Sequence, residues 1–266
     1  MKTIKREMEL FKSTVDMKRR LLISVPLTGL IRAEWAMARW GQVTPCNWSQ
    51  GEMVQWLDQF SPLGFMVADA RNVAVQAMME GNYEWILFID HDVILPPDTF
   101  NKMNQYMLKG DVPIVGGLYF TKSVPSEPLV YQGRGTSYAT GWRLGDKVWV
   151  DGMGLGCNIL HRSILEAVWK DSEQYKVGEA VARRVFDTPA RSLYDAEKNI
   201  WKTEGGTEDL VFYSRLIDNG YFAKAGWPKF QKKKFPLLCD TSIFCRHIDW
   251  NGMQFPANGE EKVFAR

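Results

Sequence analysis

Residues 85–92 read WILFIDHD, and this stretch decides the expected fold. Trp85 to Ile89 is an unbroken apolar run, which predicts a fully buried strand. The run leads directly into Asp90 and Asp92, and a proline pair at 96–97 then opens a helix. A buried strand that ends in carboxylates is typical of an α/β sheet, whose ligands lie beyond the carboxyl ends of its strands.

Strands and helices are also expected on both sides of this stretch. Apolar runs predict strands over 21–25, 65–67 and 113–118, and helical patterns occupy 32–40, 69–80, 163–170 and 208–219. Spaced aromatic residues in 123–150 suggest a hairpin, whereas 177–206, which ends in two glycines, is expected to be mobile or ordered by a ligand. The alternation predicts one α/β domain with a mixed, mostly parallel sheet flanked by helices.

Composition limits the class of protein. The 266 residues are 45% hydrophobic and 24% charged, as in an ordinary soluble domain, and no apolar run approaches the ~20 residues that span a bilayer. A net charge of +2 is too small to indicate nucleic acid or membrane as the main partner, although the charged tail or helix at 1–20 could touch a membrane surface weakly. Four cysteines without a CxxC pair predict free thiols and a cytoplasmic location.

Asp90 and Asp92 are the first candidate site residues. Residues two positions apart on an extended chain point the same way, so both carboxylates are expected to face one ligand, with His91 directed away. Two carboxylates at the end of a buried strand are costly unless a positive charge joins them. A hard divalent cation that carries a diphosphate meets this need, so the sequence predicts a site for Mn²⁺ or Mg²⁺.

Several motifs in register with these aspartates resemble the family 2 glycosyltransferases of the GT-A fold. In chain order they are Ala-Arg-Asn at 70–72, Gly-Asn-Tyr at 81–83, the apolar strand at 85–89, the acidic motif at 90–92 and the proline pair at 96–97. Weaker matches extend the resemblance over roughly residues 21–250, apart from an unusually long segment at 172–206. The resemblance implies a GT-A (Rossmann-like) domain over 21–266, with a nucleotide-sugar and metal half at 21–119 and an acceptor half at 120–266.

The resemblance also implies roles for individual residues. Those expected to bind the nucleotide sugar are Pro26, Thr28, Asp69, Arg71, Asn72, Asp90, His91, Gly154 and Gly156. The implied metal ligands are Asp90, Asp92 and His247, and the implied catalytic residues are Asp209, as general base, and its neighbour Glu208. Simpler roles stay open for some of them: Asp69 can cap its helix, Arg71 can lie on the helix surface, and acidic residues favour a helix N-terminus in any protein.

These residue types suit sugar transfer from a nucleoside diphosphate. Charge develops on the departing diphosphate, and a bound cation stabilises it without a proton. The attacking hydroxyl must lose its proton to a carboxylate such as Asp209, and attack opposite the phosphate inverts the anomeric carbon. Trp142, Trp149 and Trp227 are candidates for stacking on a sugar, and the sequence does not choose among them.

Three functional hypotheses follow from the sequence. The first is an inverting transferase that uses a UDP- or GDP-linked sugar and a hydroxyl acceptor of unidentified class. The second is a retaining transferase of the same fold or a nucleotidyltransferase-like enzyme, and the third is a catalytically silent module that binds glycans or nucleotides. The acidic motif, Asp209 and His247 together favour an enzyme, because a silent module has no need of all three.

Overall fold

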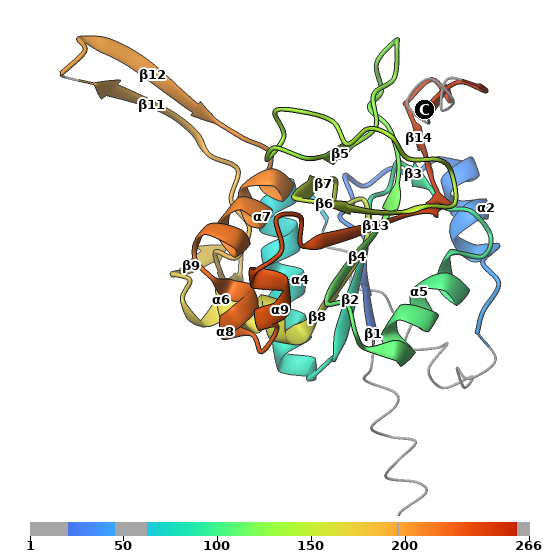
Figure 1. Cartoon of the computed structure of the whole chain (residues 1–266), viewed down its shortest axis with the longest axis horizontal. Coiled ribbons are helices and arrows are strands. Elements are labelled where there is room, and N and C mark those ends of the chain that lie inside the picture. Colours follow the sequence, from blue (N-terminus) through green and yellow to red (C-terminus); the bar gives the residue numbers. More distant parts are fainter. Residues whose placement is uncertain (1–20, 46–62, 196, 260–266) are drawn as a thin grey trace, which may run out of the picture.

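A six-stranded mixed sheet forms the centre of the protein (Figure 1). The structure, a computed structural model, describes residues 21–45, 63–195 and 197–259, so the charged segment 1–20 and Cys46 lie outside the described residues. The strands in spatial order are β1 (Leu21–Ser24), β2 (Trp85–Ile89), β8 (Cys157–His161), β4 (Ile114–Leu118), β13 (Leu237–Phe244) and β6 (Lys147–Val150).

Most strands of this sheet run in one direction. β1 and β2 are parallel, as are β4 and β13, while β8 lies antiparallel between β2 and β4 and β6 is antiparallel to β13. β1, β2, β4 and β13 therefore point the same way, and their carboxyl ends meet at one edge together with the start of β8. The predicted α/β class with a mixed, mostly parallel sheet is confirmed.

Helices flank this sheet on two sides (Figure 1). One side carries α4 (Val67–Gly81), α6 (Arg162–Lys170), α7 (Glu208–Asp218) and the short helices α8 (Tyr221–Lys224) and α9 (Pro228–Gln231). The other side carries α2 (Ala33–Trp40) and α5 (Thr99–Lys109). The helices expected from the sequence, including the one that follows the proline pair, are all present, and their predicted ends are shifted by no more than a turn.

Smaller β-sheets surround the central sheet, most of them near its upper edge in Figure 1. β3 (Val93–Ile94), β14 (Arg246–Ile248) and β15 (Gln254–Phe255) form one, and β5 (Val130–Tyr131) with β7 (Gly152–Met153) forms another. β9 (Gln174–Val177) pairs with β10 (Ala180–Arg183), and β11 (Ala190–Asp195) pairs with β12 (Ile200–Gly205) in a long hairpin that projects from the body.

One local prediction is wrong, and the structure adds detail to two others. No strand forms over 65–67, because Val67 already begins α4 and the apolar residues that follow continue its helical period. Within 123–150, a short hairpin-like pairing is present: Tyr131 and Tyr138 form an antiparallel bridge, and Ala139 N donates to the Val130 carbonyl and Gln132 N to the Ser137 carbonyl, both at 2.9 Å. The named strands of this segment pair elsewhere, β5 with β7 and β6 with β13. The segment 177–206 forms parts of two antiparallel hairpins, in which most backbone groups find partners across the strands.

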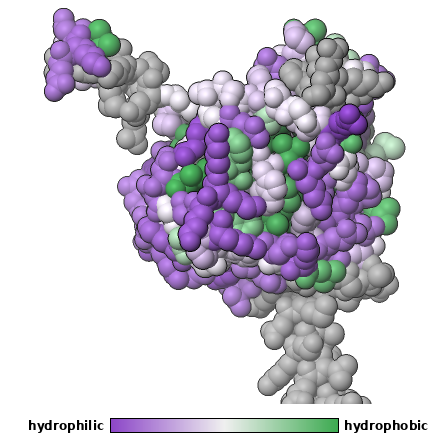
Figure 2. Space-filling view, in the orientation of Figure 1, coloured by the Kyte–Doolittle hydropathy of each residue, from purple (hydrophilic) through white to green (hydrophobic). Residues whose placement is uncertain are grey.

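The core contains the stretch from which the prediction began. All five side chains of β2 are completely buried, between β1 and β8 and beneath the flanking helices. Burial of each large apolar side chain contributes about 1.5–3 kcal/mol, so the strand that carries the acidic motif is held firmly. Hydrophilic residues cover most of the face seen in Figure 2. No helix in the described ranges is long and apolar enough to cross a membrane.

Candidate functional site

The acidic motif lies in a turn at the carboxyl end of β2. The backbone carbonyl of Asp90 accepts hydrogen bonds from Val93 N at 3.0 Å and from the Trp35 indole at 2.8 Å, and Asp90 N donates to the Gly156 carbonyl at 3.0 Å. This turn, absent from an extended strand, aims the two carboxylates at different partners. The expected common direction of Asp90 and Asp92 is therefore not found, although both line the same cavity.

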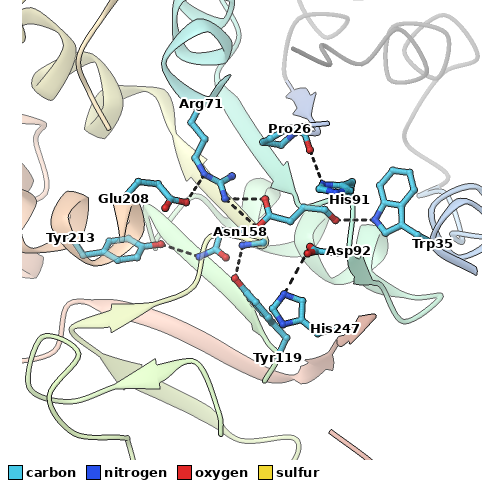
Figure 3. Close-up of polar contacts among 12 residues, drawn as sticks. Pro26, Trp35, Arg71, His91, Asp92, Tyr119, Asn158, Glu208, Tyr213 and His247 are labelled. Carbon is cyan, nitrogen blue, oxygen red and sulfur yellow. Dashed lines mark hydrogen bonds and ion pairs between the residues drawn. The ribbon is translucent and has the colours of Figure 1, made fainter. Parts of the chain in front are cut away.

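Arg71 occupies one side of the site, with Glu208 beside it (Figure 3). Its Nη2 donates to both carboxylate oxygens of Asp90, at 2.8 and 3.1 Å, and its Nε donates to Glu208 at 3.2 Å. The Arg71 side chain is only 1% exposed, so it is not the accessible phosphate or base contact that the resemblance implied, nor does it lie on the helix surface. Instead it joins the end of β2 to the start of α7.

Asn72 and Asp69 also have structural partners. The Asn72 amide donates to Tyr175 and to the Phe186 carbonyl, both at 2.8 Å, and its oxygen accepts from the backbone N–H groups of Val185 and Phe186. With every position used and 1% exposure, Asn72 has nothing left for a ligand, which corrects the expected role. Asp69 accepts from the Tyr175 hydroxyl at 2.6 Å, and it does not cap α4, whose N-cap is Met66.

Asp92 faces the opposite way, toward His247 and Lys122. Antiparallel pairing of β3 with β14 sets His247 opposite Val93, and His247 Nε2 lies 3.9 Å from Asp92 Oδ1 (Figure 3). His247 Nδ1 donates to the Phe120 carbonyl, so the lone pair of Nε2 is directed at Asp92. Lys122 Nζ forms an ion pair with the other carboxylate oxygen, Asp92 Oδ2.

The charges around Asp92 determine its protonation. Burial alone would raise the pKa of Asp92, but His247, when it is protonated, and the ammonium group of Lys122 lower the pKa overall. Burial lowers the pKa of His247 despite the nearby Asp92 carboxylate, which leaves the imidazole neutral near pH 7. We therefore assign the positive charge that balances Asp92 to Lys122.

Asp92 and His247 fit a divalent cation as a pair of ligands. Divalent cation sites often combine an ionised carboxylate with a neutral imidazole whose other nitrogen donates to a carbonyl. Phosphate and water oxygens then complete the coordination shell of Mg²⁺ or Mn²⁺. Asp90, engaged by Arg71, is not placed for this role. Over residues 21–45, 63–195 and 197–259, no three His, Cys, Asp or Glu side chains cluster as ligands, so substrate oxygens would have to complete the shell.

Asp209 lies in the first turn of α7, beside Glu208. Its carboxylate accepts hydrogen bonds from the Thr207 hydroxyl and, at 2.7 Å, from Leu210 N. Burial raises the pKa of Asp209, and the negative charge of Asp90 adds to the effect. Burial likewise raises the pKa of Glu208, against the opposing charge of Arg71. The fold thus brings Asp209 and Glu208 to the same edge of the sheet as Asp90.

Gly154 and Gly156 pack against Tyr119, which follows β4. The Tyr119 hydroxyl accepts from Gly156 N at 2.7 Å, and its ring meets the His247 ring edge-on at 4.9 Å. A Cβ on Gly154 would lie 2.0 Å from the Tyr119 hydroxyl, and one on Gly156 would lie 3.0 Å from Asp90 Oδ2. These glycines allow close packing beneath the acidic motif, a different task from the expected nucleotide contact.

Two cavities meet at the acidic motif. One of about 200 Å³ is lined by Pro26, Leu27, Thr28, Phe65, Val67, Asp90, His91 and Asp92. The other, of about 600 Å³, is lined by Thr28, Leu30, Ile31, Arg32, His91, Asp92, Lys122, Ile248, Asp249 and Trp250. His91 donates to the Pro26 carbonyl at 3.1 Å and lies 3.4 Å from the Thr28 hydroxyl, so it faces these cavities and is not directed away. Pro26, Thr28 and His91 thus line one cavity beside the acidic motif.

The tryptophans singled out from the sequence lie elsewhere. Trp142 is buried, Trp227 packs against His161 and Phe230, and the ring of Trp149 is covered by Lys233. Trp250 is 84% exposed and lines the larger cavity, where its ring can meet a ligand.

Sequence reasoning missed Tyr119, Lys122 and Trp250. Tyr119 and Lys122 directly follow a predicted strand, and the rule that ligands gather at carboxyl strand ends, which identified Asp90, would have included them. Tyr131, which stacks on Tyr138 at 5.3 Å, was missed as well; the charge of Asp209 contributes to its raised pKa, so the two residues lie near each other. No local signal marks Tyr131.

The sequence matches no known protein family and no curated protein. Among solved structures, A197 from STIV shares 19% identity with this chain, at a TM-score of 0.48 over 86% of each chain. TarS from S. aureus shares 10% identity at a TM-score of 0.34, over 56% of this chain and 29% of TarS.

Proposed function

We propose that the protein is a metal-dependent glycosyltransferase that moves a sugar from a UDP- or GDP-linked donor to a hydroxyl acceptor, with inversion. The proposal depends chiefly on one observation. Asp92 lines both cavities and has His247 Nε2 3.9 Å from its Oδ1, at the edge of the sheet that also carries Asp209. The motifs that resemble GT-A glycosyltransferases supply the substrate class.

The donor side would be formed by the two cavities. Pro26, Thr28 and His91 would contact the nucleoside, and Asp92 with His247 would hold a divalent cation. Such a cation, when bound, stabilises negative charge on the departing diphosphate. Arg71 would act indirectly, because it holds Asp90 and Glu208 in place without reaching solvent.

The acceptor side would be formed at α7. Asp209 would take the proton of the attacking hydroxyl, and burial, which raises its pKa, makes it a stronger base than an exposed aspartate. Thr207 and Leu210 N would hold one of its oxygens, so that the other is available for the acceptor. Attack from the Asp209 side, opposite the diphosphate, gives inversion, and the configuration of the product sugar tests this step.

A thermal shift experiment with UDP and GDP tests the donor site. Saturating nucleotide with Mn²⁺ should raise the Tm by roughly 5–10 °C, and nucleotide without metal should raise it much less. Asp92→Ala should abolish the metal-dependent part. Asp98→Ala, which removes an exposed carboxylate paired with Lys102 on α5, is the matched control and should respond like the wild type.

Two results would contradict the proposal. A metal-dependent shift that survives Asp92→Ala removes the metal assignment. Unchanged transfer and donor hydrolysis in Asp209→Asn removes the catalytic assignment and favours a binding module. A panel of nucleotide sugars tested for hydrolysis, which needs no acceptor, identifies the donor.

A further inference from the structure

The ammonium group of Lys122 lies beside Asp92, where the proposed divalent cation would bind. Its ammonium group pairs with Asp92 Oδ2, while His247 approaches the other oxygen, Oδ1. The Asp92 backbone is fixed, because its carbonyl accepts a hydrogen bond from Ile248 N at 2.8 Å. The carboxylate of Asp92 therefore projects from a backbone position that is held in place.

The loop that carries Lys122 is held by its own hydrogen bonds, whereas the lysine side chain borders an open cavity. Thr121 N donates to the Glu127 carbonyl at 2.8 Å, Glu127 N donates back to the Thr121 hydroxyl at 3.0 Å, and Ser126 donates to the Ser123 carbonyl at 2.9 Å. The side chain of Lys122 is 34% exposed and lines the 600 Å³ cavity next to Asp92. Its four-carbon stem can thus carry the ammonium group from Asp92 into this cavity.

A divalent cation and an ammonium group compete for the same carboxylate. Two positive charges on one carboxylate repel each other strongly in a partly buried site, where screening by water is weak. A cation on Asp92 and His247 would therefore displace Lys122. A diphosphate in the adjacent cavity would offer the displaced ammonium group new oxygen partners, and a charge-assisted hydrogen bond to phosphate is a strong one.

We propose that Lys122 is an internal counter-ion that couples metal binding to diphosphate binding. Without nucleotide it neutralises Asp92 and weakens metal binding; with metal and nucleotide present it moves onto the diphosphate. Because coupling between two ligands is reciprocal, the nucleotide then tightens metal binding and the metal tightens nucleotide binding by the same factor. This inference rests on the proposed donor site and adds a positioning residue to it.

The test compares Lys122→Met with the wild type in Mn²⁺ binding, followed by the electron paramagnetic resonance signal of free Mn²⁺. Without nucleotide, the variant should bind Mn²⁺ about three- to tenfold more tightly, because the competing ammonium group is gone. With saturating Mn²⁺, the variant should bind UDP or GDP about three- to tenfold more weakly. The two effects have opposite signs, which a merely structural role of Lys122 would not produce.

Two further variants complete the design. Lys122→Arg keeps the charge and should retain most of the coupling. Lys109→Met removes a lysine with a similar ion pair, to Asp111 at 2.7 Å, at the far end of α5, and should bind both ligands like the wild type. Urea unfolding of each variant checks that the fold is intact.

The possible failures are distinguishable. If the wild type binds UDP or GDP in a metal-dependent way but Lys122→Met shows unchanged or weaker Mn²⁺ affinity without nucleotide, the coupling role of Lys122 is overturned and the donor site stands. If the wild type binds neither nucleotide at any Mn²⁺ concentration, the proposed function fails, and the role of Lys122 fails with it.

Discussion

Arg71 is the residue on which the geometry of the site depends most. It is buried between two carboxylates that come from different parts of the chain, Asp90 after β2 and Glu208 in α7. Arg71→Met should lower the free energy of unfolding by about 3–5 kcal/mol, because it leaves both carboxylates without their buried counter-ion. Urea denaturation measures the change.

Lys224→Met is the control for Arg71→Met. Lys224 pairs with Asp171 at 2.9 Å, but both side chains are about half exposed, so this variant should unfold almost like the wild type. If both substitutions lower the free energy of unfolding equally, the two buried ion pairs of Arg71 contribute no more to stability than an exposed ion pair does.

The buried carboxylate of Asp209, which we propose as the general base, lowers the stability of the folded protein at neutral pH. Its folded-state pKa is raised by burial, so the folded protein favours the protonated form, and stability is lost as pH rises through that pKa. Asp209→Asn keeps an oxygen for Thr207 and Leu210 but carries no charge. It should therefore raise the free energy of unfolding at pH 7 by about 1 kcal/mol while transfer is lost.

The pH dependence provides the check on this prediction. Below the unfolded-state pKa of aspartate both proteins are uncharged at position 209, so the advantage of Asp209→Asn should disappear there. An advantage that persists unchanged at acid pH would mean that the charge of Asp209 is not the cause.

At the scale of elements, the connection between β7 and β8 supports the acidic motif. Gly154 passes so close to Tyr119 that Gly154→Ala must displace the ring that packs on His247. We expect this variant to lose about 1–3 kcal/mol of stability and to bind Mn²⁺ and nucleotide more weakly. Gly205→Ala, at a position where an added Cβ meets no atom within 4 Å, is the control. If Gly154→Ala shows the same nucleotide-dependent rise in Tm as the wild type, the close packing of Gly154 on Tyr119 does not support the donor site.

At the scale of the whole molecule, the β11–β12 hairpin is separate from the body that holds the site (Figure 1). Its strands pair with each other in register, Arg191 opposite Glu204, just before α7 begins. Replacement of residues 192–203 by Asn-Gly, which favours a two-residue turn, should change the unfolding free energy by less than about 1 kcal/mol. Metal-dependent nucleotide binding should also be unchanged, and its loss would show that the hairpin belongs to the donor site.

The sequence by itself determined the elements whose signal is local. The apolar run of β2, the helical period of α4 and the start of α7 at two acidic residues are readable because each depends on neighbours within a few positions. The same local order places Asp90 and Asp92 at the end of a buried strand. The fold class and the position of the candidate site in the fold follow from these signals.

Only the tertiary structure decided which side chains meet. The turn after Ile89 separates Asp90 from Asp92, Arg71 reaches Glu208 across 137 positions, and the pairing of β3 with β14 brings His247 to Asp92. Lys122 meets Asp92 because β4 ends at the same edge of the sheet as β2. Such contacts depend on strand order and register. Packing of the whole core sets both, and no short stretch of sequence determines them.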